Sequence, residues 1–239
     1  MDSTSFTTLS RQTGLEREMR VVANNIANSA TTGYRQEGLI FSEYVVSSPG
    51  TESVSMSRAN IRNTSMEQGA LTKTGGTLDL AIEGDSYFMV ETPLGERLTR
   101  SGAFSNNAAG DLVTADGLRV LDAGRAPVFI PSDAKSISFG QDGTLSADGR
   151  PLGQIGLFKP SEGSQMVRED GVMFRIEGEI EESLDGRVHQ GFLESSNVNA
   201  IDQITRMIEI QRAYEMGQSF LETEDQRVRD AIEKLSSRS

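Results

Sequence analysis

The sequence predicts an α+β fold in which an N-terminal and a C-terminal helix pair as a coiled coil, with an antiparallel β domain inserted between them in the sequence. Helical periodicity occurs near both ends of the 239 residues, and short β-favouring runs separated by Gly and Asp-Gly turns fill the middle. A hydrophobic content of 36% without Trp suits a narrow or layered core. We expect a helical domain from residues 1–35 and 196–239, a connector over 36–68 and a β-rich domain over 69–195.

The first helix is predicted from Ser5 to Asn28. Its apolar residues recur at spacings of 4, 3 and 4, which places them on one helical face with charged residues facing away: Leu15, Met19, Val22 and Ile26. The run Thr31-Thr32-Gly33 ends the helix, because β-branched residues followed by Gly favour a turn. Residues 47–66 are rich in Ser, Thr and Asn and show no sustained period, so they predict a loosely structured connector.

From Gly69 to about Gln190 the chain alternates short β-favouring runs with turns, which is typical of an antiparallel β domain of meander or barrel-like type. The similar segments GDLVTADG (110–117) and GTLSADG (143–149) predict two hairpins, each closed by an Asp-Gly turn. A solenoid would need at least three stacked repeats. Because a tight hairpin turn selects Asp before Gly, we interpret the Asp of each turn as structural and not as a cation ligand.

A long helix is predicted from Val198 to about Leu235, with Ser195, Ser196 or Asn197 as its N-cap. Residues recur every 3 or 4 positions along it, and they form a heptad seam with one polar exception, Glu224: Met207, Ile210, Tyr214, Gly217, Leu221, Glu224, Val228, Ala231 and Leu235. Such a helix would extend roughly 57 Å, more than a small domain buries. The first helix has a similar seam, so the simplest pairing is a coiled coil.

Charge and composition exclude several functions. The net charge is −12, and residues 48–195 hold 13 basic and 22 acidic groups, so we expect no nucleic-acid partner. The sequence lacks an apolar run of the ~20 residues that span a bilayer, and its start does not resemble an ordinary secretory signal. We therefore expect no membrane insertion. The absence of cysteine excludes disulfides, thiolate catalysis and zinc–sulfur sites.

Motifs for catalysis or cofactor binding are also missing. The single histidine, His189, lies in a strand-like run, and neither a G-x-S-x-G elbow nor a phosphate-binding or EF-hand loop is present. We expect no enzyme activity, no cofactor and no metal. Two alternatives stay open at this point: a hydrolase whose residues are dispersed along the chain, and a soluble interaction module that works through its coiled coil.

Three stretches resemble one family. ANNIANSATTGYR (23–35) is similar to the N-terminal signature of flagellar axial proteins, which include the rod, hook and hook-associated proteins. The run from GALTKTGG to DGLRVL (69–121) resembles the β domain of the rod proteins, and GFLESSNVNAIDQITRMIEIQRAYEMGQSF (191–220) resembles their C-terminal signature. Together they cover about half of the chain in the family's order. The likeness is greater to the proximal rod branch, with the distal rod branch as the alternative.

This resemblance implies a structural rod subunit of the flagellar basal body. It implies export by the flagellar type III apparatus, a periplasmic location, and terminal segments that fold into helices on joining a helical tube of identical subunits and other rod proteins. The function implied is the transmission of torque. The residues expected at the assembly interface come from the matched signatures and the helical seams: Leu15, Met19, Val22, Asn24, Asn25, Ile26, Asn28, Thr32, Gly33, Tyr34, Asn197, Val198, Ile208, Gln211, Arg212, Tyr214, Leu221 and Val228.

Overall fold

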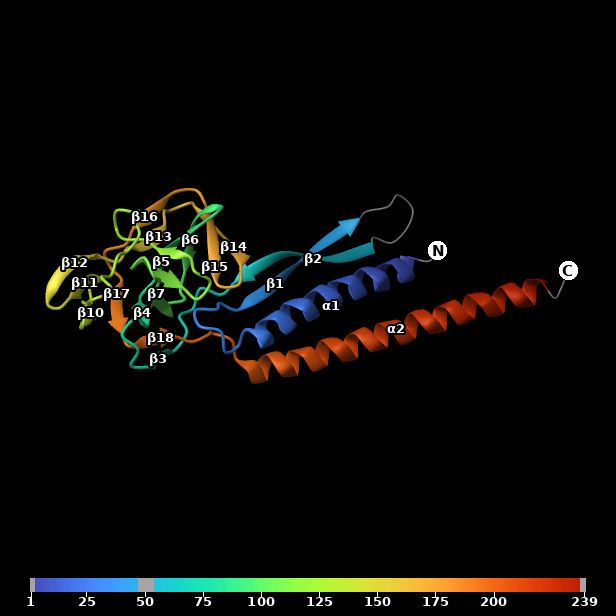
Figure 1. Cartoon of the computed structure of the whole chain (residues 1–239). Coiled ribbons are helices and arrows are strands. Elements are labelled where there is room, and N and C mark those ends of the chain that lie inside the picture. Colours follow the sequence, from blue (N-terminus) through green and yellow to red (C-terminus); the bar gives the residue numbers. More distant parts are fainter. Residues whose placement is uncertain (1–2, 47–53, 237–239) are drawn as a thin grey trace. The chain divides into compact units, whose positions relative to one another are not determined.

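A computed structural model describes residues 3–46 and 54–236 and has the predicted α+β composition. The chain divides into two units, which we describe separately (Figure 1). The helical unit comprises Met1–Ala27, Gln36–Ser65 and Val198–Ser239, and the β unit comprises Asn28–Arg35 and Met66–Asn197. Every strand pairing among the described residues is antiparallel.

The helical unit contains both predicted helices, α1 (Ser3–Ala27) and α2 (Ala200–Ser236). The predicted N-caps of the second helix are wrong by at least two residues, because Asn199 is the residue that caps it. The Asn199 side-chain oxygen accepts a hydrogen bond from the Ile201 backbone N–H at 3.1 Å. An asparagine directly before the first helical residue satisfies an N–H that would otherwise have no partner.

A β-hairpin completes the helical unit and corrects the expectation of an irregular connector. Strand β1 (Glu37–Val46) pairs with β2 (Val54–Thr64), with a bulge between Ile40 and Phe41. Both strands contact α1. The polar residues of β2 have weak strand propensity by themselves, and a partner strand of β-branched and aromatic residues supplies the pairing. Residues 47–53 of the predicted connector lie outside the described residues.

The β unit is built from short strands. These are β3 (Leu71–Lys73), β4 (Leu80–Glu83), β5 (Tyr87–Thr92), β6 (Gly95–Thr99), β7 (Phe104–Asn106), β8 (Leu112–Thr114), β9 (Arg119–Val120), β10 (Ile137–Phe139), β11 (Thr144–Ala147), β12 (Arg150–Gln154), β13 (Leu157–Pro160), β14 (Gln165–Asp170), β15 (Met173–Glu177), β16 (Ile180–Glu182), β17 (Arg187–Gln190) and β18 (Phe192–Glu194). One sheet has the order β14-β15-β6-β5-β9-β8-β7, and β13 pairs with both β5 and β16. Smaller sheets have the orders β10-β11-β12, β17-β4 and β18-β3.

Both predicted Asp-Gly hairpins are confirmed. The first joins β8 to β9, and its Gly117 has a φ of 80°. The second joins β11 to β12, and its turn residues Asp148 and Gly149 have φ angles of 50° and 76°. Two consecutive residues with positive φ give the turn whose twist matches that of the flanking strands, and Asp-Gly is among the pairs that adopt it most readily.

The core of the β unit is layered because strand β5 contributes to both of its faces. Alternate residues Phe88 and Val90 join one buried cluster, and Tyr87 and Met89 join another. This follows from the two-residue period of a strand that is covered on both sides. In the first cluster, the ring of Phe88 packs edge-on against that of Phe104 with centroids 5.1 Å apart.

Candidate assembly interface

The α2 seam predicted from heptad spacing faces α1. Its buried or half-buried positions recur at alternating spacings of 4 and 3, and Ala213 is half-buried beside them: Gln203, Met207, Ile210, Tyr214, Gly217, Leu221 and Glu224. The Gln12 side-chain amide donates to the Tyr214 carbonyl at 3.0 Å, and Arg206 pairs with Glu18 at 2.6 Å. Asn25 of α1 contacts Gln203 of α2. Along these three contacts the residue numbers fall on α1 while they rise on α2, so the two helices lie antiparallel.

The predicted interface residues on these helices differ in exposure. Val22 is buried on α1, and Leu15, Met19 and Ile26 are half-buried, whereas Asn24 is exposed. Tyr214 and Leu221 are half-buried on α2, and Val198 is buried just before that helix. Ile208, Gln211, Arg212 and Val228 are exposed. The structure therefore brings the seam residues together, and it leaves the other group on the surface of the helical unit.

Asn25 forms a buried hydrogen-bond network within the chain. Its side-chain oxygen accepts from the Glu37 backbone N–H at 2.9 Å, and its amide nitrogen donates to the Glu37 carbonyl at 2.7 Å and to the Gln203 side chain at 3.1 Å. These contacts join α1 to β1 and to α2. Asn25 is 1% exposed, so its amide serves intramolecular contacts, and its contact with neighbouring subunits stays a prediction.

A second apolar face on α2 is open to solvent. Ile201, Ile204 and Ile208 lie outside the seam at spacings of 3 and 4, and all three are exposed, Ile201 to 75%. Of these residues the sequence interpretation singled out only Ile208 and missed the other two. Their spacing on one helical face was the available signal.

The seam also continues beyond α1. At 1.5 Å per residue, α1 is about 37 Å long and α2 about 55 Å long. Since the pairing begins near the C-terminal end of α1, the last turns of α2 extend past the start of α1 (Figure 1). Val228 continues the heptad there and is exposed, and so is Ile232, which shares the heptad position of Ile204. Apolar side chains at seam spacing with no described residue covering them are typical of a surface that another chain covers.

The β unit holds the predicted turn after α1. Gly33 has a φ of 71°, and its backbone N–H donates to the Glu194 carbonyl at 2.8 Å. Tyr34 is buried, and its carbonyl accepts from the Asn197 N–H at 3.3 Å. The Asn197 side chain donates to the Glu67 carbonyl at 2.8 Å. The segments around residues 34, 67 and 197, which are distant in sequence, are thus hydrogen-bonded together inside the β unit. Asn28 and Thr32 of the same turn are half-buried.

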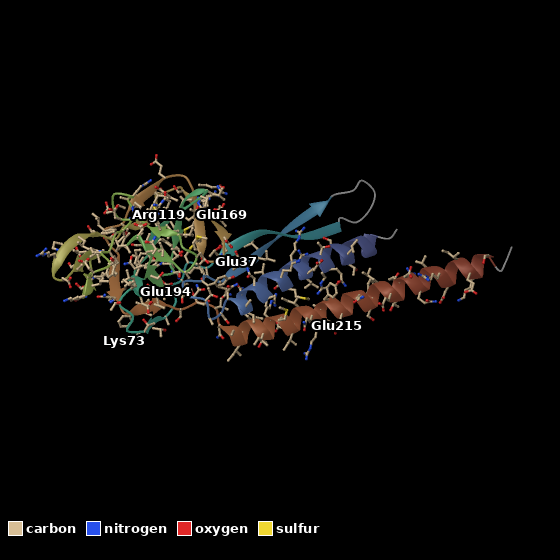
Figure 2. The ribbon with its side chains drawn as sticks, in the orientation of Figure 1. Glu37, Lys73, Arg119, Glu169, Glu194 and Glu215 are labelled. Carbon is tan, nitrogen blue, oxygen red and sulfur yellow. The ribbon has the colours of Figure 1, made fainter. Side chains whose placement is uncertain are left out.

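A buried charge cluster, which the sequence interpretation missed, supports this turn. The carboxylate of Glu194, which Figure 2 labels, pairs with Arg35 at 3.0 Å and with Arg100 at 3.3 Å, and it accepts the Gly69 N–H at 3.1 Å. The three charged side chains are at most 1% exposed. Burial lowers the pKa of the Arg100 guanidinium, against the opposing charge of Glu194. Ion pairs of this kind are assembled from separate segments, so no local sequence signal identifies them.

Arg100 also contacts the aromatic and backbone groups around it. Its guanidinium lies 5.0 Å from the centre of the Tyr87 ring, and it donates hydrogen bonds to the carbonyls of Ile82 and Gly84. Burial raises the pKa of the Tyr87 phenol, although the charge of Arg100 opposes the shift. The cluster therefore holds residue 35, where the chain first leaves the β unit, against residue 194, shortly before the chain leaves that unit again.

The described residues contain neither a candidate metal site nor a helix that could span a membrane. Within residues 3–46 and 54–236 no group of three or more His, Asp and Glu side chains is placed to hold a metal ion. His189 pairs with Glu83 at 2.8 Å on the surface of β17 and β4. In the same part of the chain, no helix is both long and apolar enough to cross a membrane.

Comparison with known families matches three segments. A model described as flagella basal body rod protein matches residues 7–35. A flagellar hook protein FlgE/F/G D1 domain matches residues 81–147, and the C-terminal domain of flagellar basal body rod FlgEFG proteins matches residues 189–233. The first segment covers most of α1 and the turn after it, and the second covers part of the β unit. The third covers the last residues of the β unit and most of α2.

Relatives that align over nearly their whole length are named as flagellar basal-body rod proteins. The chain is 37% identical to the flagellar basal-body rod protein FlgF of Caulobacter vibrioides over 98% of both chains, and 36% identical to that of Mesorhizobium japonicum over the whole of both. It is 32% identical to the rod protein FlgG of Bacillus subtilis over 95% of this chain and 97% of the relative. With helices, turn and β unit all inside these alignments, the chain belongs to the flagellar basal-body rod protein family.

Proposed function

We propose that this chain is a structural subunit of the flagellar rod, closer to the FlgF branch at the proximal rod than to the FlgG branch at the distal rod. It assembles helically with copies of itself and other rod proteins, and it transmits torque. The terminal segments 1–35 and 196–239 form the axial layer, where the helices pair as a coiled coil, and residues 69–195 form the outer layer. Residues 36–68 join the two segments, and most of them form the β1–β2 hairpin of the helical unit. The subunit reaches the periplasm through the flagellar type III apparatus and has no catalytic role.

One observation carries this proposal: α2 presents apolar residues that its own chain leaves exposed. The first set is Ile201, Ile204 and Ile208, and the second is Val228 and Ile232. Burying a side chain of this size on another subunit contributes about 1.5–3 kcal/mol. Because the two sets lie at opposite ends of the helix, one subunit can contact different neighbours, as a helical tube requires.

The relatives also support a structural role, since the names they carry are those of rod proteins. Identity of 36–37% to the FlgF proteins, against 32% to a FlgG protein, favours the proximal branch. The predicted interface residues Ile208, Gln211, Arg212 and Val228 are exposed, and subunit contacts can reach them.

The test introduces charge on the open α2 face. In a motile strain that lacks the endogenous gene, the double variant Ile204→Asp/Ile208→Asp should abolish swimming and remove the chain from purified basal bodies. The secreted variant should keep the circular dichroism spectrum of the unmodified chain, because both side chains are exposed. The matched control, Leu184→Asp, charges an apolar residue of the β unit that is 86% exposed, and it should still swim. Normal incorporation of the double variant would refute the proposal.

A further inference from the structure

The β unit contains an open cleft that the helical assembly proposed above does not use. Its volume is about 740 Å³, and turns between neighbouring strands line it. Thr92, Pro93 and Leu94 come from the end of β5 and the turn into β6, residues 170–173 from the β14–β15 turn, and Asp116 from the β8–β9 turn. Figure 2 labels Glu169, which lies at the same cleft.

The cleft combines an apolar surface with an acidic rim. Leu94, Leu118, Val172 and Met173 supply apolar side chains, and Leu94 is 77% exposed. Among the described residues, Asp116 and Asp170 form no ion pair, whereas Glu169 pairs with Arg97. The rim thus has two uncompensated carboxylates. Such a surface favours a partner with exposed apolar side chains next to a cation.

The β11–β12 hairpin of the same chain has this complementary character. All five residues of β12 are exposed, and the strand forms the edge of its sheet. A register shift leaves Leu152 without an opposite residue, because Ser146 pairs with Pro151 and Leu145 with Gly153. A bulge of this type redirects the extra side chain, here one that is 44% exposed.

A cation lies two residues away. Arg150 is exposed at the start of β12, and none of the described residues forms an ion pair with it. Leu152 and the exposed Phe129 line a shallow cavity of about 180 Å³, which offers space for an apolar side chain from outside. Pro151 removes a backbone donor from this edge strand, so docking here would rely on side chains more than on added strand pairing.

We propose that the β11–β12 hairpin of one copy docks into the cleft of the β unit of an adjacent copy. Leu94 of the receiving copy packs against Leu152 and Phe129 of the docking copy, and Arg150 pairs with Asp116 and Asp170. This inference rests on the proposed function, because it needs neighbouring copies in an assembly. It adds a contact between β units to the contacts between terminal helices.

The positions of the two surfaces agree with an extending assembly. Within the β unit, the β11–β12 hairpin lies at one end, and the β6 and β14–β15 turns that line the cleft lie toward the other (Figure 1). A contact between two different surfaces repeats from copy to copy, and it forms an open series unless the rotation closes a ring. One small contact of this kind binds weakly alone, and it gains from the helix contacts that hold the copies close together.

The test uses the absence of natural cysteine from the chain. The double variant Leu94→Cys/Leu152→Cys, assembled in cells and treated with a short bismaleimide, should give dimers and larger species of this chain from purified basal bodies. Each single variant should give at most a background level. The pair Leu94→Cys/Leu184→Cys is the matched control, because Leu184 is also exposed but lies outside both surfaces.

A charge-reversal series gives a second, independent measurement. Arg150→Glu should lower the crosslinking yield on the order of tenfold, since it replaces attraction by repulsion, and the added changes Asp116→Lys/Asp170→Lys should restore it. If the cysteine variants are incorporated but do not crosslink above the control pair, the docking proposal is wrong while the rod function stands. Absence of the unmodified chain from basal bodies would instead overturn the rod function.

Discussion

Replacing Glu194 by glutamine would remove the carboxylate that lies between two buried arginines of the β unit. In the structure its oxygens contact Arg35 at 3.0 Å and Arg100 at 3.3 Å, and all three side chains are at most 1% exposed. Glutamine retains the size of the side chain and an acceptor for the Gly69 N–H, but it leaves two buried positive charges without a counter-charge. The variant isolates the electrostatic contribution of the cluster.

The expected loss is large. Removing one partner of a buried ion pair costs about 3–5 kcal/mol, because the remaining charge stays desolvated. A domain of this size loses about 3 °C of melting temperature for each kcal/mol, so the transition of the β unit should fall by about 10–15 °C. Differential scanning calorimetry is the suitable assay, since it does not depend on tryptophan, which the sequence lacks.

Two further variants make the result decisive. Glu181→Gln breaks the exposed pair with Lys159, whose side chain is 39% exposed, and this control should cost less than about 1 kcal/mol. Adding Arg35→Met to Glu194→Gln should recover part of the loss, because one of the two uncompensated charges is then gone. A fall of less than about 3 °C for Glu194→Gln, or no recovery in the double variant, would refute the reasoning.

Three more predictions concern single residues. Asn25→Ala should cost about 1–3 kcal/mol in urea unfolding by leaving buried backbone groups of β1 unpaired, and the exposed Asn24→Ala should cost clearly less. Gly33→Ala should lower the melting temperature more than Gly75→Ala: both have positive φ, but a Cβ at residue 33 would lie 2.4 Å from a backbone nitrogen, whereas at residue 75 it meets open space. The hydrogen bond from its arginine partner lowers the pKa of Glu169, so its stabilisation is present above the unfolded pKa of about 4.3 and is lost as pH falls through the folded value. Glu169→Gln should therefore flatten the decline of melting temperature below about pH 4.3, and parallel curves would contradict this.

The features that the sequence predicted correctly depend on local patterns. The helices α1 and α2 follow from apolar spacing, and the seam through Ile210 and Tyr214 follows from one heptad. The β11–β12 hairpin follows from an Asp-Gly pair whose positive φ angles few other dipeptides adopt. In each case the information lies within a few neighbouring residues.

The features that it missed depend on distant partners. Strand β2 reads as irregular because its Ser and Asn residues have weak strand propensity, and it forms only against β1. Glu194 meets Arg35 and Arg100 from segments far away in sequence. The cap at Asn199 was missed for a different reason, since several adjacent polar residues could each have served.

The hydrogen bonds around Tyr34 and Asn197 have a mechanical consequence. Tyr34 is bonded to Asn197, which is also bonded to Glu67, so the segments by which the chain enters and leaves the β unit are tied to one another. A tensile force applied through these segments acts first on those hydrogen bonds and on the Arg35–Glu194 ion pair, and only then on the strands of the β unit. The sheets are thereby shielded from tension along the chain.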